Sequence, residues 1–448
     1  MFFGRFAILT HIVRIAVGGL FIFSGFIKAN DPVGFSIKLE EYFEVFGQGF
    51  SCDMQVAAQT TGIPCEQEVV KRKADEQKRA ELEAKKAADP NYVEPQLQHE
   101  ETFFKKLNEY FAHHSLFLAI LICGLEMALG LFLLLGIQVR WTLLLLLAMI
   151  IFFSFLTFYS ACCNKVTSCG CFGDAIPLTP WESFWKDLIL LILISILFVG
   201  EHHIRPLIKN GIVMAAVAGT GLFLSFAFPV YTYRHLPIID FRPYKIGTNW
   251  YEAMQKKDPA TSGCKRDSVI ITYYYQQAGT GKMVHFRSTS MNDSFPDSTY
   301  NYYCRHDHYV WKGTCDATIL DFGLADPETG ENFNDSILRL KGVVFFLIME
   351  DIDKADRAAM GKVNLFYKDA QQSNVVFYGL SNSGSEKNAL FREETGAKYP
   401  MLQVDGTALK TIIRSNPGLV MLKDGVAVAM WHANDIPGFA EAMEAYGK

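Results

Sequence analysis

The chain has 448 residues, of which 50% are hydrophobic and 20% are charged, and its formal net charge is −5. Soluble globular proteins carry about 25% charged residues, whereas here long apolar runs gather in residues 1–231 and residues 240–448 have the composition of a globular domain. No basic patch of the kind that binds nucleic acid accompanies them. This composition excludes a nucleic-acid-binding protein and favours a membrane protein with a water-soluble domain.

Five apolar runs are candidates for membrane-spanning helices. A hydrocarbon core about 30 Å thick requires roughly 20 residues of helix. The runs are 8–27, 115–136, 141–160, 181–200 and 211–230. The fourth of them carries Glu182, Lys186 and Asp187 at one end, where the membrane interface would lie. We predict five spans, and we expect the first to be retained because no small-residue cleavage site follows it.

The cysteines indicate the compartment. In a five-span chain, nine of the ten face one side, and only Cys123 lies inside a span. Thiols gathered on one face are typical of an oxidising compartment, and a modest excess of Lys and Arg in the opposite loops is typical of the cytoplasmic side. We predict a bacterial inner-membrane protein with a cytoplasmic N-terminus and a periplasmic C-terminal domain. Because nine is odd, at least one of these thiols is free or changes its partner.

Residues 45–112 form a long insertion between the first two spans. It contains Cys52 and Cys65, which are candidates for a structural disulfide, and then a segment rich in Glu, Lys, Arg and Ala at 66–88. We interpret this segment as a solvated helix with ion pairs four residues apart. A docking arm would have the same pattern.

Two charged residues lie inside predicted spans, Arg14 in the first and Glu126 in the second. A charge in a bilayer is costly, so such residues face inward and pair, and they often mark functional sites. We predict that Arg14 and Glu126 pair, either to fix helix packing or to form a proton or quinone site. The pairs at 113–114 and 202–203 are histidines without metal-site spacing, and no metal is expected.

The most informative segment is residues 160–174, at the end of the third span. Four cysteines fall within ten residues there: Cys162, Cys163, Cys169 and Cys171. Bridges across such short spacings would be strained, and strained, exposed disulfides exchange readily. The four are therefore candidates for catalytic thiols in a disulfide relay. A fixed disulfide staple is an alternative, and a zinc site is a third, although the spacing is not the common Cys-x2-Cys repeat.

The membrane part contains several short motifs: Ser24-Gly25, Lys28, Asp31-Pro32, Gly34-Phe35, Glu126 with Gly130, and Cys169-Gly-Cys171-Phe-Gly173. With these motifs it resembles the DoxX/MauE family over residues 8–200, apart from the insertion. The cysteine motif resembles the signature of the MauE branch. The resemblance implies a four-helix membrane bundle related to thiol–quinone redox proteins. MauE itself is associated with maturation of a disulfide-rich periplasmic enzyme. The insertion and the C-terminal domain depart from the family.

The segment 237–315 is rich in tyrosine and is predicted to be a β-rich extracytoplasmic subdomain. Strands are expected at 268–276 and 282–287, joined by a turn at 278–281. Cys304 and Cys315 bracket a polar, aromatic stretch, and we expect them to be bonded to each other as a structural staple.

Residues 316–448 are predicted to form an α/β domain. Buried strands at 342–349 and 374–380 flank a helix at 353–371, which indicates a parallel pair. A hairpin is expected from 418 to 432, with its turn at Lys423-Asp-Gly425. Pro417 before this hairpin resembles the cis-proline of thioredoxin-like domains, which implies a partner-binding surface. Asp321-Phe-Gly-Leu with Lys341-Gly resembles the entry to the TlpA/peroxiredoxin-type subgroup. The stretch 349–360, where such enzymes carry Cys-x-x-Cys, contains no cysteine.

We therefore predict a membrane all-α bundle at 1–200, a fifth transmembrane helix and linker at 201–236, the β-rich subdomain, and a thioredoxin-like domain. The expected function is thiol–disulfide redox chemistry that supports oxidative maturation or assembly of envelope proteins, with a quinone as a candidate cofactor. The alternative is a non-enzymatic, membrane-anchored scaffold that binds partner proteins. A transporter is disfavoured because no inverted repeat is evident. The sequence leaves the clients, the redox direction and the oligomeric state open.

Overall fold

The structure is a computed structural model. It describes residues 2–47, 103–163, 166, 170, 172–287, 299–311, 313–320 and 322–447. Two compact units make up the chain. The first comprises residues 1–49, 103–254 and 318–448, and the second comprises residues 50–102 and 255–317.

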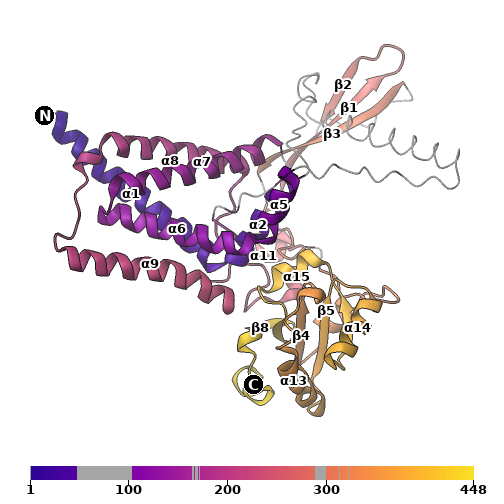
Figure 1. The fold of residues 1–448 in the computed structure, drawn as a ribbon. Coiled ribbons are helices and arrows are strands. Elements are labelled where there is room, and N and C mark those ends of the chain that lie inside the picture. Colours follow the sequence, from indigo (N-terminus) through magenta and orange to yellow (C-terminus); the bar gives the residue numbers. More distant parts are fainter. Residues whose placement is uncertain are drawn as a thin grey trace. The chain divides into compact units, whose positions relative to one another are not determined.

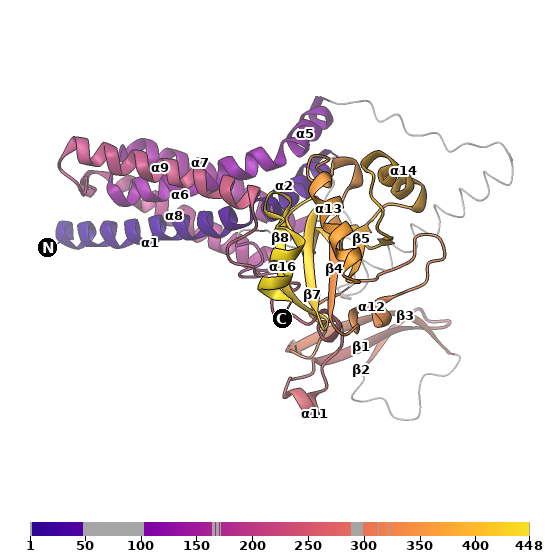
Figure 2. The same cartoon turned by 90° about the horizontal axis from the view of Figure 1, so that it is seen from below.

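The first unit contains a bundle of five long helices that run alongside one another (Figure 1 and Figure 2). They are α1 (Phe2–Asn30), α6 (Ser115–Leu135), α7 (Val139–Cys163), α8 (Pro180–Val199) and α9 (Gly211–Arg234). Two shorter helices, α2 (Pro32–Gly47) and α5 (Phe103–His113), pack against each other at one end. Leucine, valine and isoleucine side chains from α1, α6, α7 and α8 form the buried core.

Four of the described helices, α1, α6, α7 and α9, are long and apolar enough to cross a membrane. Their outer faces carry exposed apolar side chains, such as Ile212 and Phe223 on α9. Lipid tails can cover such faces, so the bundle is a membrane bundle. Helix α8 lies along α7 but begins with Glu182, Lys186 and Asp187. The fifth span therefore stays a prediction.

The ends of these helices follow from their sequence. Helix α8 begins with a capping box, in which the Thr179 side chain accepts from the Glu182 N–H and Glu182 accepts from the Thr179 N–H, and Pro180 occupies its first turn. Helix α6 ends at Gly136, whose φ of 73° lies in the left-handed region that glycine favours.

The first unit also contains a five-stranded mixed sheet with the order β6-β5-β4-β7-β8. Strand β4 pairs in parallel with β5 and antiparallel with β7. The strands are β4 (Val343–Met349), β5 (Val376–Ser381), β6 (Met401–Gln403), β7 (Gly418–Lys423) and β8 (Val426–His432). The helices around it are α12 (Asn334–Leu338), α13 (Met360–Gln372), α14 (Ser385–Thr395), α15 (Gly406–Ile412) and α16 (Phe439–Tyr446).

Alternate residues of β4 enter two separate cores, because successive side chains of a strand point to opposite faces. Phe345 and Leu347 pack with α13 and α16, while Phe346 and Ile348 pack with α15 and Trp250. The sheet order, its two covered faces and the cis Asn416–Pro417 peptide before β7 define a thioredoxin-like domain. The predicted fold class is confirmed.

One detail of this domain differs from the sequence prediction. The helix expected at 353–371 begins only at Met360, because the preceding residues form a short turn, η3 (Ile352–Lys354), capped by the Asp351 side chain. The hairpin is as predicted and turns at Asp424 and Gly425, whose φ angles of 51° and 81° suit a tight turn between strands. Further short helices are η1 (Glu201–His203), α10 (Trp250–Ala253) and η4 (Ala433–Asp435).

The described part of the second unit is a three-stranded antiparallel sheet with the order β2-β1-β3, preceded by α11 (Pro259–Ser262). Strands β1 (Ser268–Gln277) and β2 (Met283–Arg287) were predicted, whereas β3 (Tyr300–Trp311) was not. The expected Cys304–Cys315 bond is wrong, since Cys315 is bonded to Cys264. Cys304 is also disulfide-bonded. The predicted Cys52–Cys65 bond lies outside the described residues.

The central strand of the thioredoxin-like sheet offers a test of this fold. Leu347 on β4 is 0% exposed, whereas Leu365 on α13 is 65% exposed. We expect Leu347→Ala to lower the free energy of opening of the sheet by about 2–5 kcal/mol, because it leaves a cavity, and Leu365→Ala to change it by less than about 0.5 kcal/mol. Hydrogen exchange of the β4 and β7 amides in the full-length protein measures both, and equal effects would contradict this core.

Candidate functional site

A buried ion pair joins α1 to α6 inside the membrane bundle. The Lys28 Nζ lies 2.5 Å from the Glu126 Oε1, and both side chains are 2% exposed. The ammonium also faces the Phe153 ring at 4.4 Å and the Phe35 ring at 5.2 Å, which contributes a favourable cation–π attraction. Such a pair in a bilayer is costly to form and still more costly to break, because either charge alone would be uncompensated.

Two glycines allow this pair to form. A Cβ atom at Gly25 would lie 2.9 Å from the Glu126 Cβ, and one at Gly130 would lie 2.8 Å from the Gly18 carbonyl oxygen. The missing side chains let α1 and α6 approach closely, and Lys28 follows Gly25 by one helical turn on the same face. One physical purpose thus accounts for four positions of the motif. The close approach of α1 and α6 at Gly25 and Gly130 allows Lys28 and Glu126 to pair.

A second buried acid faces the same interior. Asp187 on α8 is 1% exposed, accepts a 3.2 Å hydrogen bond from the Thr157 hydroxyl on α7, and lies 2.7 Å from the Lys186 Nζ. Lys28, Glu126, Lys186 and Asp187 all line one small cavity of about 30 Å³. A polar cavity of this size has room for about one water molecule. One oxygen of Glu126, Oε2, is buried without a hydrogen-bond partner among the described residues.

The predicted pairing of Arg14 with Glu126 is wrong. Arg14 instead donates hydrogen bonds to the carbonyls of Leu133 and Leu134, at 2.8 and 2.6 Å. It therefore satisfies the last turn of α6, where carbonyls lack helical partners and a cation is favoured. Arg14 and Lys28 are about 21 Å apart along α1 at roughly 1.5 Å per residue. Lys28 is part of the sequence motif and could have been proposed as the partner of Glu126. It was not, because it lies just beyond the apolar run at 8–27.

The cysteine loop follows α7 directly. Cys162 is a free, half-buried thiol, and the adjacent Cys163 is disulfide-bonded. Cys169 and Cys171 lie outside the described residues. The Ser160 hydroxyl donates to the Val166 carbonyl, which anchors the start of the loop. Within the described ranges, no group of three or more His, Cys, Asp or Glu side chains is placed to hold a metal ion.

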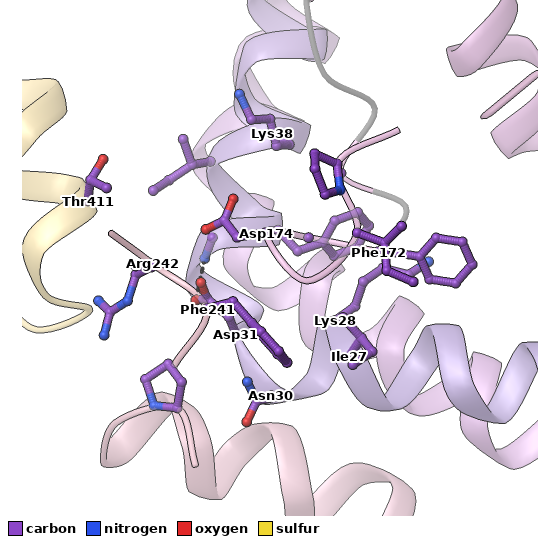
Figure 3. A pocket seen from close by; sticks show the side chains of 18 of the residues that line it. Ile27, Lys28, Asn30, Asp31, Lys38, Phe172, Asp174, Phe241, Arg242 and Thr411 are labelled. Carbon is purple, nitrogen blue, oxygen red and sulfur yellow. Dashed lines mark hydrogen bonds between the residues drawn. The ribbon is translucent and has the colours of Figure 1, made fainter. Parts of the chain in front are cut away.

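A larger pocket of about 620 Å³ opens beside this loop, and we call it the loop chamber (Figure 3). Its walls come from the end of α1 and the start of α2, from the segment 170–183, from the linker 237–243, and from α15 with the residues that follow it. Gly170 lines the chamber, and in the sequence it stands between Cys169 and Cys171. The chamber and the small cavity share Lys28 and Phe172.

Asp31 links several walls of the chamber. Its side chain caps α2 by accepting from the Gly34 N–H at 2.8 Å, with Pro32 as the first helical residue. The same carboxylate pairs with Arg414 at 2.9 Å. One residue earlier, Asn30 exchanges two hydrogen bonds with the backbone of Ile239 in the linker. Nearby, burial raises the pKa of Glu350, while the positive charges of Lys410 and Arg414 oppose this shift.

The loop before β7 already forms hydrogen bonds with another segment of the same domain. The Asn416 carbonyl accepts from the Asp356 N–H at 2.9 Å, and the Asn416 side chain donates to the Asp351 carbonyl at 2.7 Å. These partners belong to the stretch that carries Cys-x-x-Cys in redox-active thioredoxin-like domains. The cis-proline geometry at Pro417 is present, and its role in binding partner proteins stays a prediction.

The fold and the site together define a membrane helical bundle fused to a thioredoxin-like domain. The family model of methylamine utilisation protein MauE matches residues 88–200. Protein TlpB of Flavobacterium psychrophilum is 38% identical over 83 residues, which are 17% of this chain and 22% of that protein. The chain thus spans about a fifth of the curated relative that it matches. The membrane part is MauE-like, and the resemblance read from the motifs is confirmed.

One solved structure that matches part of this chain comes from Bacteroides thetaiotaomicron. It is the solution structure of a candidate protein disulfide isomerase, 18% identical, and the match covers 28% of this chain and 83% of that one with a TM-score of 0.22. The thioredoxin-like class of the domain rests on its own sheet order and cis-proline.

The ion pair between α1 and α6 can be tested by removing one or both charges. We expect Glu126→Leu to destabilise the bundle by about 3–5 kcal/mol, because it leaves Lys28 buried without a counter-charge. The double variant Lys28→Met/Glu126→Leu should recover most of this loss, since no buried charge remains. Thermal unfolding in detergent, followed by tryptophan fluorescence, measures both. The matched control is Lys38→Met/Glu41→Leu, an ion pair at the protein surface. A single variant as stable as the parent would contradict the burial of this pair.

Proposed function

We propose that this protein is a membrane thiol–disulfide redox protein whose exchange centre is the loop with Cys162, Cys163, Cys169 and Cys171. One observation carries the proposal: a free thiol at Cys162 stands next to a disulfide-bonded Cys163 at the end of α7. Thiol–disulfide exchange requires a thiol and a disulfide within reach of each other. A disulfide that only stabilises the fold does not require a free thiol beside it.

The exchange proceeds in two steps in the oxidative direction. A client thiolate attacks one sulfur of the loop disulfide, which forms a mixed disulfide and releases the other loop cysteine as a thiolate. A second client thiolate then attacks the mixed disulfide, so the client forms a disulfide and the loop becomes a dithiol. The client loses two electrons, the loop gains them, and the two client protons end on the loop thiols. Cys162 can attack the same disulfide and so move it within the loop.

The loop works on the extracytoplasmic side of a bacterial inner membrane in this proposal. The bond between Cys264 and Cys315 and the bonded state of Cys304 support an oxidising compartment for the second unit. The N-terminus is then cytoplasmic and α8 is the fourth of five spans. The clients are envelope proteins that mature by disulfide formation.

The thioredoxin-like domain has a different role from the loop. Residues 316–448 contain no cysteine, so this domain cannot exchange disulfides itself, and we assign it to the recruitment of partner proteins. The same observation favours the second candidate function, a non-enzymatic scaffold or assembly factor. In that case the loop cysteines only stabilise the bundle.

A quinone, the candidate electron acceptor, does not fit the charged interior of the bundle. The cavity beside Glu126 holds about 30 Å³, whereas pockets for small molecules usually hold about 300–1,000 Å³. Arg14, the other residue predicted for this role, is held by backbone carbonyls at the end of α6. The reoxidation of the loop is therefore not assigned to a quinone at these residues.

The free thiol next to a disulfide supplies the test. We expect Cys162→Ser to slow the exchange of the loop with a small dithiol at least about tenfold, because the free thiol that attacks the adjacent disulfide and moves it within the loop is lost. Cys123→Ser, which removes a buried thiol inside α6, is the matched control and should leave the rate unchanged. Sequential alkylation of free and then reduced cysteines, read by mass spectrometry in native membranes, measures the redox state of each cysteine.

The two candidate functions predict different patterns in this experiment. In the redox protein, the four loop cysteines occur in mixed states that shift when reductant is added. A single fixed pairing under every condition, together with an unchanged rate in the Cys162→Ser variant, would establish the scaffold instead.

A further inference from the structure

Two residues that line the loop chamber each have a buried polar atom without a hydrogen-bond partner among the described residues. These atoms are the Nη1 of Arg242 and the hydroxyl of Ser183. The Arg242 side chain is 3% exposed, and Ser183 is 0% exposed. A buried donor without an acceptor costs about 1–3 kcal/mol. Each residue can satisfy this atom by turning it toward an occupant of the chamber that offers a hydrogen-bonding partner.

Most charges of the described residues that line the chamber are already compensated. Among these residues, five cationic side chains line it, and four of them form ion pairs: Lys28 with Glu126, Lys38 with Glu41, Arg242 with Asp240, and Arg414 with Asp31. The fifth, Lys410, lies in the field of Glu350. The balance selects against a strongly charged occupant, such as an anionic headgroup, which would have to displace an existing partner.

Much of the remaining lining is apolar. It contains aromatic and aliphatic side chains together with four prolines, which fix the backbone of the walls. These residues are Ile27, Phe35, Ile37, Phe172, Ile176, Leu178, Ile239, Phe241, Pro177, Pro180, Pro237 and Pro243. A volume of about 620 Å³ lies within the usual range for specific binding pockets.

We propose that the loop chamber binds an extended, uncharged and mostly apolar polypeptide segment, which brings a client cysteine to the loop. When the segment binds, both side chains turn toward it, so that the Arg242 Nη1 donates to one of its backbone carbonyls and the Ser183 hydroxyl pairs with a backbone N–H. The chamber reaches the loop at Gly170, between Cys169 and Cys171. The disulfide exchange of the client cysteine rests on the proposed function. The binding of the polypeptide segment to the chamber does not rest on that function.

The position of the thioredoxin-like domain supports this occupant. Residues Thr407, Lys410, Thr411 and Arg414 of this domain line the chamber, as Figure 3 shows for Thr411. The backbone at Asn416, beside the cis-proline, already bonds to Asp356. The domain therefore contributes to binding through the side chains with which it lines the chamber. The client does not have to break the hydrogen bond between Asp356 and Asn416.

The first experiment fills the chamber. Two exchange rates of the full-length protein are compared: the rate with an acetylated, amidated nine-residue alanine–leucine peptide that has a central cysteine, and the rate with dithiothreitol. Thr411→Trp should lower the ratio of the peptide rate to the dithiothreitol rate at least about tenfold, or about 1.4 kcal/mol. Lys368→Trp, on the exposed face of α13, is the matched control. A ratio equal to that of the control would overturn the proposal.

The second experiment measures binding without exchange. A benzophenone amino acid at position 411 is irradiated in phosphatidylcholine nanodiscs with the same peptide, its cysteine replaced by serine. We expect cross-linking to this peptide and about tenfold less to a version with two glutamates. Cross-linking to phospholipid instead, or equal cross-linking to both peptides, would overturn the chamber assignment. Should cross-linking succeed while the wild-type loop exchanges with neither peptide nor dithiothreitol, the redox function fails and the chamber stands.

Discussion

The burial of Lys28 against Glu126 is the constraint on which the last turn of α1 and the residues that follow it depend. Two opposite charges can remain in the interior of a membrane bundle only if they touch. Contact requires α1 and α6 to approach closely, which Gly25 and Gly130 permit. Helix α1 is thereby fixed up to its last turn. The residues that follow, Asn30 and Asp31, can then hold the linker and Arg414 in place.

The proposed function places the chemistry and the recognition in separate parts of the chain. The free thiol of Cys162 and the disulfide-bonded Cys163 are the last two residues of α7, while the thioredoxin-like domain has no cysteine and contributes a wall of the chamber. A thioredoxin-like domain that has no reactive thiol can still position a polypeptide, because its surface is retained when the thiols are absent. The proposed function uses the loop for exchange and the domain for binding.

Sequence reasoning succeeded where a local pattern carries the information. The apolar runs predicted the long helices, the alternation of strand and helix predicted the parallel pair β4 and β5, and Lys423-Asp-Gly425 predicted the hairpin. It failed where partners are distant in the chain. Arg14 was paired with Glu126 because both are charges in apolar runs, but the helix register brings Lys28 there instead. Cys315 was paired with Cys304, its nearer neighbour, although it is bonded to Cys264.

The sequence by itself determined the class of this protein: a MauE-like membrane bundle joined to a thioredoxin-like domain without reactive cysteines. Length, apolarity, periodicity and the absence of a residue type can all be read along the chain. Only the tertiary structure decided which charges neutralise each other, which of two adjacent cysteines is free, and that four separate segments enclose one chamber. These are consequences of how helices approach in space, and the free energy of burying a charge or a polar atom depends on that approach rather than on sequence distance.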